Sequence, residues 1–168
     1  MRAVKVAAAI ALGCAITLAE RAQGYENVTL SQPDAPLRII DYEAEFVDDE
    51  DHYAEDGILH RVEVQNASGP NVVAYSIGLV ALDAFGDYMD SFVGYAVGAV
   101  QQGQSDHADW HQSVADAYSF EEYGTSIAFV RAVRFEDGTV WKAAMDQVTP
   151  ELKGHAPEFE PGFLESDD

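Results

Sequence analysis

Cysteine is nearly absent from this chain of 168 residues, and its single copy, Cys14, lies in an apolar run close to the N-terminus. If that run is removed during export, the working protein holds no thiol. Disulfide bridges, cysteine nucleophiles and metal sites built on cysteine are then excluded together. The domain must therefore be held by its hydrophobic core, and about 145 residues are enough for a sizeable one.

Basic side chains are also scarce. The chain has 9 Lys and Arg against 30 Asp and Glu, a net charge of −21, and removal of its first 22 residues would leave a net charge of about −23. Such a surface repels phosphate backbones and anionic lipids, which argues against nucleic-acid binding and against a polybasic membrane contact. Three explanations of the acidity stay open: a soluble or salt-adapted surface, binding of divalent cations, and recognition of a protein partner with a basic surface.

The N-terminal apolar run is too short to span a membrane. It covers 14 residues, Val6 to Ala19, whereas a membrane-spanning helix needs about 20. Arg2 and Lys5 precede it, and small residues close it at Ala19 and Ala22. This pattern predicts a cleaved signal peptide over residues 1–22 and a periplasmic or secreted protein.

Lipidation of Cys14 is the competing interpretation, because residues 11–14 partly resemble a bacterial lipoprotein box. Ala11 stands where that box usually has Leu, and residues 15–19 remain apolar after the cysteine. We therefore favour cleavage without a lipid anchor.

Residues 23–36 are polar and predict a linker, and the pattern beyond them is that of β-strands. In 37–46, inward Ile40, Tyr42, Ala44 and Phe46 alternate with carboxylates, which is the period-two pattern of a half-buried strand. Residues 72–85 are apolar on both faces and predict a central strand. Turn signals recur about every ten residues, which is typical of an all-β sandwich. We expect further strands around 59–65, 95–99, 127–135 and 139–142, the last two joined by a turn at Asp137 and Gly138.

Two segments are less regular. Residues 107–123 fit a helix or a strand, and we favour a strand. Residues 148–168 hold three of the six prolines and end in acidic residues, so we predict a flexible acidic tail. The predicted sandwich domain therefore spans residues 37–147.

A family resemblance rests on turn and strand motifs within residues 59–142. The chain resembles the small exported bacterial Ig-like β-sandwich proteins of the FxLYD type, although Leu82 replaces their Tyr and Gln102 replaces their Pro. The resemblance implies a single Ig-like antiparallel β-sandwich of unknown function, and the fold by itself supplies no activity. The motifs that carry it are 62–66, 72–82, 83–86, 103–105 and 130–141.

An acidic loop offers hard oxygen ligands of the kind that Ca²⁺ prefers. The spacing departs from the EF-hand pattern, because taking Asp49 as the first ligand places Tyr53 fifth. A solvated loop without bound metal explains the same residues. The candidate ligands are Asp48, Asp49, Glu50, Asp51, Glu55 and Asp56.

Two further residue pairs have plain structural explanations. His107 and His111 could share a Zn²⁺ ion on a helix, but on a strand they would lie about 13 Å apart, too far to chelate together. Asp83 and Asp87 flank a glycine turn, where Asp residues more often bond the backbone than act as an acid–base pair. Similarly, we assign Tyr75, Phe129 and Trp141 to the core.

The sequence contains neither the G-x-S-x-G motif nor a glycine-rich phosphate loop. We therefore expect a non-enzymatic binding or structural module of the cell envelope, without a cofactor. It would bind a protein through edge-strand pairing or through charge, and an exposed aromatic patch at Tyr88, Phe92 and Tyr95 would favour this hypothesis. A Ca²⁺-binding protein using residues 48–56 is the alternative, and a hydrolase is the third hypothesis.

Overall fold

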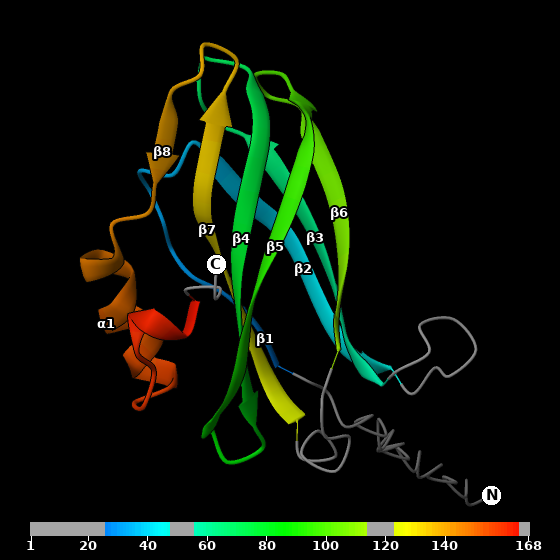
Figure 1. Cartoon of the computed structure of the whole chain (residues 1–168), viewed down its shortest axis with the longest axis vertical. Helices are drawn as coiled ribbons and strands as arrows, with labels where there is room; N and C mark the ends of the chain where they lie inside the picture. Colours follow the sequence, from blue (N-terminus) through cyan, green and yellow to red (C-terminus); the bar gives the residue numbers. More distant parts are fainter. Residues whose placement is uncertain (1–25, 48–55, 114–122, 165–168) are drawn as a thin grey trace, which may run out of the picture.

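Two facing sheets contain the strands of the protein (Figure 1). The structure is a computed structural model that describes residues 26–47, 56–113 and 123–164. The first sheet, sheet A, has the order β1 (Glu26–Thr29), β7 (Tyr123–Phe135), β4 (Val72–Asp83) and β5 (Tyr88–Val100), and β8 (Val140–Lys142) also pairs with β7. The second, sheet B, has the order β2 (Leu37–Val47), β3 (Gly57–Asn66) and β6 (Ser105–Ser113).

The strand pairing is that of an Ig-like sandwich. With β2 taken as strand A, sheet B has the order A-B-E, and sheet A contains strands G, F, C and C′ as β8, β7, β4 and β5. The pairs within this set are antiparallel, and β1 adds a short parallel pairing to β7. The predicted all-β sandwich is confirmed. β1 lies inside residues 23–36, which the sequence predicts to be a linker.

The inner core fills the space between the sheets with alternate residues of each strand. Tyr42 and Ala44 point inward from β2 as predicted, and Tyr75 faces them from sheet A. Ile40, predicted to point inward, is 48% exposed. The β2–β3 register shifts between Ile39 and Asp41, and this irregularity moves Ile39 to the core and Ile40 to the surface.

A second core lies on the outer face of sheet A. Val80 and Leu82 of β4 and Ile127 and Phe129 of β7 pack there against the C-terminal segment. That segment contains helix α1 (Met145–His155) and the 3₁₀ turn η2 (Pro161–Leu164), and Figure 1 shows α1 beside the lower part of sheet A. Its buried residues are Val148, Leu152, Ala156, Phe159 and Leu164.

The predicted flexible acidic tail is therefore wrong over residues 148–164. Pro150 lies inside α1, where proline normally disfavours a helix, and this residue conceals the helix in the sequence. The apolar outer face of β4 explains why the segment is ordered, because that face has to be covered. Neither α1 nor η2 is long and apolar enough to cross a membrane, and no other helix occurs among the described residues.

Gly78 allows the aromatic ring of Phe129 to lie directly across β4, because a Cβ at this position would overlap the ring. Phe129 is fully buried. We predict that Gly78→Ala lowers the free energy of unfolding by about 1–3 kcal/mol, the usual cost of overpacking a core. Urea unfolding measures the change.

Gly98→Ala on β5 is the matched control, because a Cβ at Gly98 meets nothing within 4 Å. Alanine packs and orders a strand better than glycine, so this control should be neutral or slightly stabilising. An equal loss of stability in the two variants would contradict the explanation.

Candidate functional site

Most of the predicted calcium loop lies outside the described residues. Of its six carboxylates only Asp56, immediately before β3, is described. Within the described ranges, no group of three or more His, Asp or Glu side chains is arranged to hold a metal ion. Calcium binding by residues 48–56 stays a prediction.

His107 and His111 both lie on β6, as the preferred strand interpretation of this segment predicts. In an extended strand, residues four apart are separated by about 13 Å, which excludes a metal ion shared by the two rings. His107 Nε2 instead lies 2.8 Å from Asp109 Oδ1.

Asp83 organises the β4–β5 turn. Its Oδ1 accepts hydrogen bonds from the backbone N–H groups of Phe85 and Asp87, each at 2.8 Å. The backbone role predicted for this aspartate is confirmed.

The exposed aromatic patch of Tyr88, Phe92 and Tyr95 that would favour a binding module is not formed. Tyr88 stacks on Phe163 of η2 with ring centroids 4.5 Å apart, and Phe92 packs against the inner core. Only Tyr95 is exposed, at 61%. Regular alternation would place Tyr88 and Phe92, four residues apart, on the same face of β5. The β4–β5 register shifts between Ala81 and Leu82, and this irregularity turns Tyr88 towards the C-terminal segment while Phe92 points inward.

A different surface gathers exposed apolar and basic side chains. We call it the Tyr95 face; it is the outer surface of the upper half of sheet A in Figure 1, above the part that the C-terminal segment covers. The strand register places its residues in two rows across β5, β4, β7 and β8. One row is Tyr95, Ser76, Ala132 and Lys142, and the other is Val97, Ala74, Arg134 and Val140.

Large apolar side chains are unusually exposed on the Tyr95 face. Val97 is 90% exposed and Val140 51%. With Tyr95, they are three of the six large hydrophobic side chains exposed in the described parts of the chain. On the middle strands β4 and β7 the two rows have small residues at Ser76, Ala132 and Ala74 and one long side chain at Arg134, so the exposed hydrophobic side chains stand at the two sides of the face.

Basic side chains also concentrate there. Only six Lys and Arg residues follow residue 25, and three of them, Arg131, Arg134 and Lys142, belong to this face. Arg131 Nη1 donates a hydrogen bond to the Tyr95 hydroxyl at 3.4 Å, so their side chains meet over β4. This face is absent from the sites predicted from the sequence, although three cations within twelve residues of a strongly acidic chain were a usable signal.

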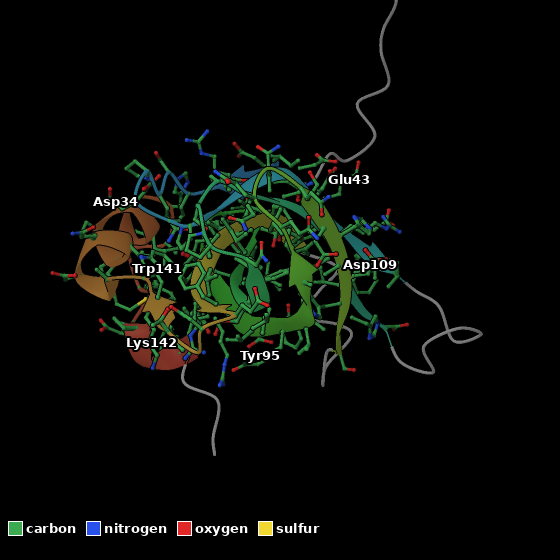
Figure 2. The ribbon with its side chains drawn as sticks, turned by 90° about the horizontal axis from the view of Figure 1, so that it is seen from above. Asp34, Glu43, Tyr95, Asp109, Trp141 and Lys142 are labelled. Carbon is green, nitrogen blue, oxygen red and sulfur yellow. The ribbon has the colours of Figure 1, made fainter. Side chains whose placement is uncertain are left out.

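The opposite surface has the opposite charge. The outer face of sheet B presents the row Asp41, Glu63, His107 and the row Glu43, Arg61, Asp109. Arg61 Nη2 lies 2.7 Å from Glu45 Oε1, and this hydrogen bond raises the pKa of Arg61. Figure 2 shows Tyr95 and Lys142 on one side of the sandwich and Glu43 on the other.

A buried polar chain crosses the interior between the sheets. Gln112 Nε2 donates to Asp90 Oδ2 at 2.7 Å, which leaves Gln112 Oε1 to accept from His60 Nε2 at 3.0 Å. His60 Nδ1 then accepts from the Tyr42 hydroxyl at 3.0 Å, and the Ser126 hydroxyl donates to the Tyr42 oxygen. The geometry thus defines one neutral tautomer of His60 and a single hydrogen-bond direction from β7 to β5.

The buried polar chain is closed to solvent at His60 and at Ser126, since both residues are fully buried. Burial lowers the pKa of His60 to about 4, while its hydrogen bond to Gln112 acts in the opposite direction. Burial likewise raises the pKa of Tyr42. His60 and Tyr42 therefore stay neutral near pH 7. The buried polar chain ties the two sheets together, with Ser126 at one end and Asp90 at the other.

Comparisons with known proteins bear on the fold alone. No model of a known protein family matches the chain, and no curated protein is similar to it. A crystal structure of a hypothetical protein from Peptoclostridium difficile 630 is similar with a TM-score of 0.53 and 13% identity, covering 74% of this chain and 93% of that one. The X-ray structure of a structural-genomics target, SoR45, is similar with a TM-score of 0.42 and 11% identity, covering 64% of this chain and 80% of that one.

The low pKa of His60 predicts a pH-dependent loss of stability. The unfolded chain binds a proton at the usual pKa of 6.5, whereas the folded chain binds it only near 4. The free energy of unfolding should therefore fall by about 3 kcal/mol as the pH drops from 6.5 to 4. Urea unfolding at several pH values measures this slope.

His60→Gln should flatten the slope between pH 6.5 and 4, whatever its effect on stability at pH 7. The exposed His107→Gln is the control and should leave the slope unchanged. Equal slopes for His60→Gln and the unmodified protein would show that His60 is not the group responsible.

The calcium prediction is tested by thermal melting in EDTA, in millimolar Ca²⁺ and in millimolar Mg²⁺. A specific site would raise the melting temperature with Ca²⁺ in a saturable way, because ligand binding stabilises the folded state. Replacing the carboxylates of residues 48–56 by amides should abolish the rise. Equal shifts with Ca²⁺ and Mg²⁺ would indicate general charge screening.

Proposed function

We propose that the protein is an exported, non-enzymatic binding module of the cell envelope that contacts a protein partner through the Tyr95 face. Its N-terminal sequence supports export with removal of residues 1–22. The observation that carries the binding role is the two-row Tyr95 face, where exposed apolar side chains stand among the few cations of a strongly acidic chain.

The composition of this face matches that of protein interfaces. Tyr and Arg are enriched at interface centres, and an exposed apolar patch bordered by polar residues is a common mark of a contact site. Burying a side chain such as Val97 contributes about 1.5–3 kcal/mol. The strands hold the rows in place before binding, so little ordering entropy is lost.

The charge of the face selects an acidic partner surface. Arg131, Arg134 and Lys142 would meet carboxylates, which adds specificity and speeds association more than it adds affinity. The basic partner expected from the net charge would instead contact acidic parts of the surface, such as the outer face of sheet B. The Tyr95 face is the stronger candidate because it joins charge to exposed apolar area.

Site-specific photo-cross-linking in the native cell envelope tests this function. A photoreactive amino acid replaces Val97 in one variant of the full chain and Glu43, on sheet B, in another. We expect a discrete cross-linked product with an acidic protein from position 97. Arg134→Glu should reduce its yield at least fivefold because the acidic partner is then repelled.

Arg38→Glu is the control, since Arg38 is also an exposed arginine but lies near the start of β2, in the other sheet from the Tyr95 face. It should leave the yield within twofold. A product that forms only from position 43, or one that Arg134→Glu and Arg38→Glu reduce alike, would refute a contact through the Tyr95 face.

A further inference from the structure

A small cavity lies where three segments meet: the β1–β2 connection, the chain leaving β8, and the first turns of α1. Its volume is about 60 Å³, which is roughly the space of two water molecules. Figure 2 shows Asp34 and Trp141, two of its lining residues, on the side of the sandwich next to the helix. The apolar part of its wall includes Leu30, Ala143 and Val148.

The residues lining this cavity include two acidic residues, both exposed to solvent, and one tryptophan. Asp34 and Glu151 come from the β1–β2 connection and from α1, and Trp141 comes from β8. Neither carboxylate forms an ion pair with another side chain in the described part of the protein. An aromatic wall together with negative charge is the combination that binds an alkylammonium group, through cation–π and charge-assisted contacts.

The walls are held in place by hydrogen bonds. Gln32 clamps the β1–β2 connection to β7, because its amide donates to the Val130 carbonyl at 2.9 Å and accepts from the Val130 N–H at 2.7 Å. Glu151 Oε1 accepts from the Ser31 N–H at 3.2 Å, which joins α1 to the same connection. The cavity is thus preorganised rather than formed by a loose loop.

The electrostatics favour a cation. The first turn of α1 borders the cavity and contributes a partial positive charge, equivalent to about half an elementary charge. Two full negative charges outweigh it. The acidic character of the whole chain adds to the attraction of a cation and steers it towards the protein.

We propose that this cavity is a binding site for a primary alkylammonium group, of the kind at the tip of a lysine side chain. The ammonium would lie between Asp34 and Glu151, and the methylenes would lie along Trp141. The site is separate from the Tyr95 face and does not depend on the function proposed for it. It supplies a specific contact for the basic partner that the net charge suggests.

The test uses Nα-acetyl-lysine methylamide as the probe and the indole ¹H–¹⁵N signal of Trp141 as the readout. We expect a saturable shift with a dissociation constant in the millimolar range. The norleucine analogue has the same stem without the charge, so it should bind at least tenfold more weakly. Equal binding of the two compounds would overturn the proposal.

Conservative variants localise the binding. Asp34→Asn and Glu151→Gln should each weaken it at least fivefold, and the amide oxygen introduced by Glu151→Gln can still accept the Ser31 hydrogen bond. Asp146→Asn is the control, because Asp146 is an exposed carboxylate in the first turn of α1 that does not line the cavity. If Asp146→Asn weakened binding of the probe as much as Asp34→Asn does, the binding would depend only on the general negative charge of the protein, and the proposal would be overturned.

A comparison with n-butylamine distinguishes the two possible sources of the alkylammonium group, a lysine side chain of a polypeptide and a free amine. Tighter binding of the acetyl-lysine amide would show that the site reads a lysine within a polypeptide, and equal binding would show that it takes free amines as well. Both results support an alkylammonium site. No change of the Trp141 signal with either compound would refute it.

Discussion

The two-sided burial of β4 and β7 is the constraint on which the rest of the structure depends. Their inner faces pack on sheet B, and their outer faces carry Val80, Leu82, Ile127 and Phe129. Burying these four side chains contributes up to about 6–12 kcal/mol, which is comparable with the whole stability of a typical domain, about 5–15 kcal/mol. The C-terminal segment therefore contributes substantially to the stability of the fold.

How much of sheet A the C-terminal segment covers also determines where the two candidate sites lie. The segment covers the lower rows of sheet A and ends there, so the upper rows stay exposed as the Tyr95 face. The cavity lies at the junction where the chain leaves β8 and enters α1. Both sites thus follow from how one terminal segment packs on one sheet.

The sequence predicts the strands well because their side chains alternate with period two, and it predicts the turns because Asp83 and the Asp137–Gly138 pair have strong local preferences. It misplaces Ile40, since a shift in register depends on the neighbouring strand. It misses α1 because Pro150 outweighs the apolar spacing of the helix. These errors come from tertiary contacts, which a local pattern does not contain.

The candidate sites are harder to predict than the strands. The rows of the Tyr95 face join residues 95 and 97 to residues 134–142, and only the pairing of four strands brings them together. The buried polar chain likewise takes one residue from each of five strands. Its inward polar residues, His60 and Gln112, are visible as interruptions of the apolar alternation, but their partners are not.

The separation of charge between the two outer faces gives the molecule a permanent electric dipole across its thickness. A uniform acidic surface would only be repelled by an anionic neighbour, such as a lipid headgroup layer. A dipolar molecule also experiences a torque, which turns its cation-bearing side towards the negative layer while the net charge holds it at a distance. Next to any negatively charged layer, the protein would therefore have a preferred orientation before it touched a partner.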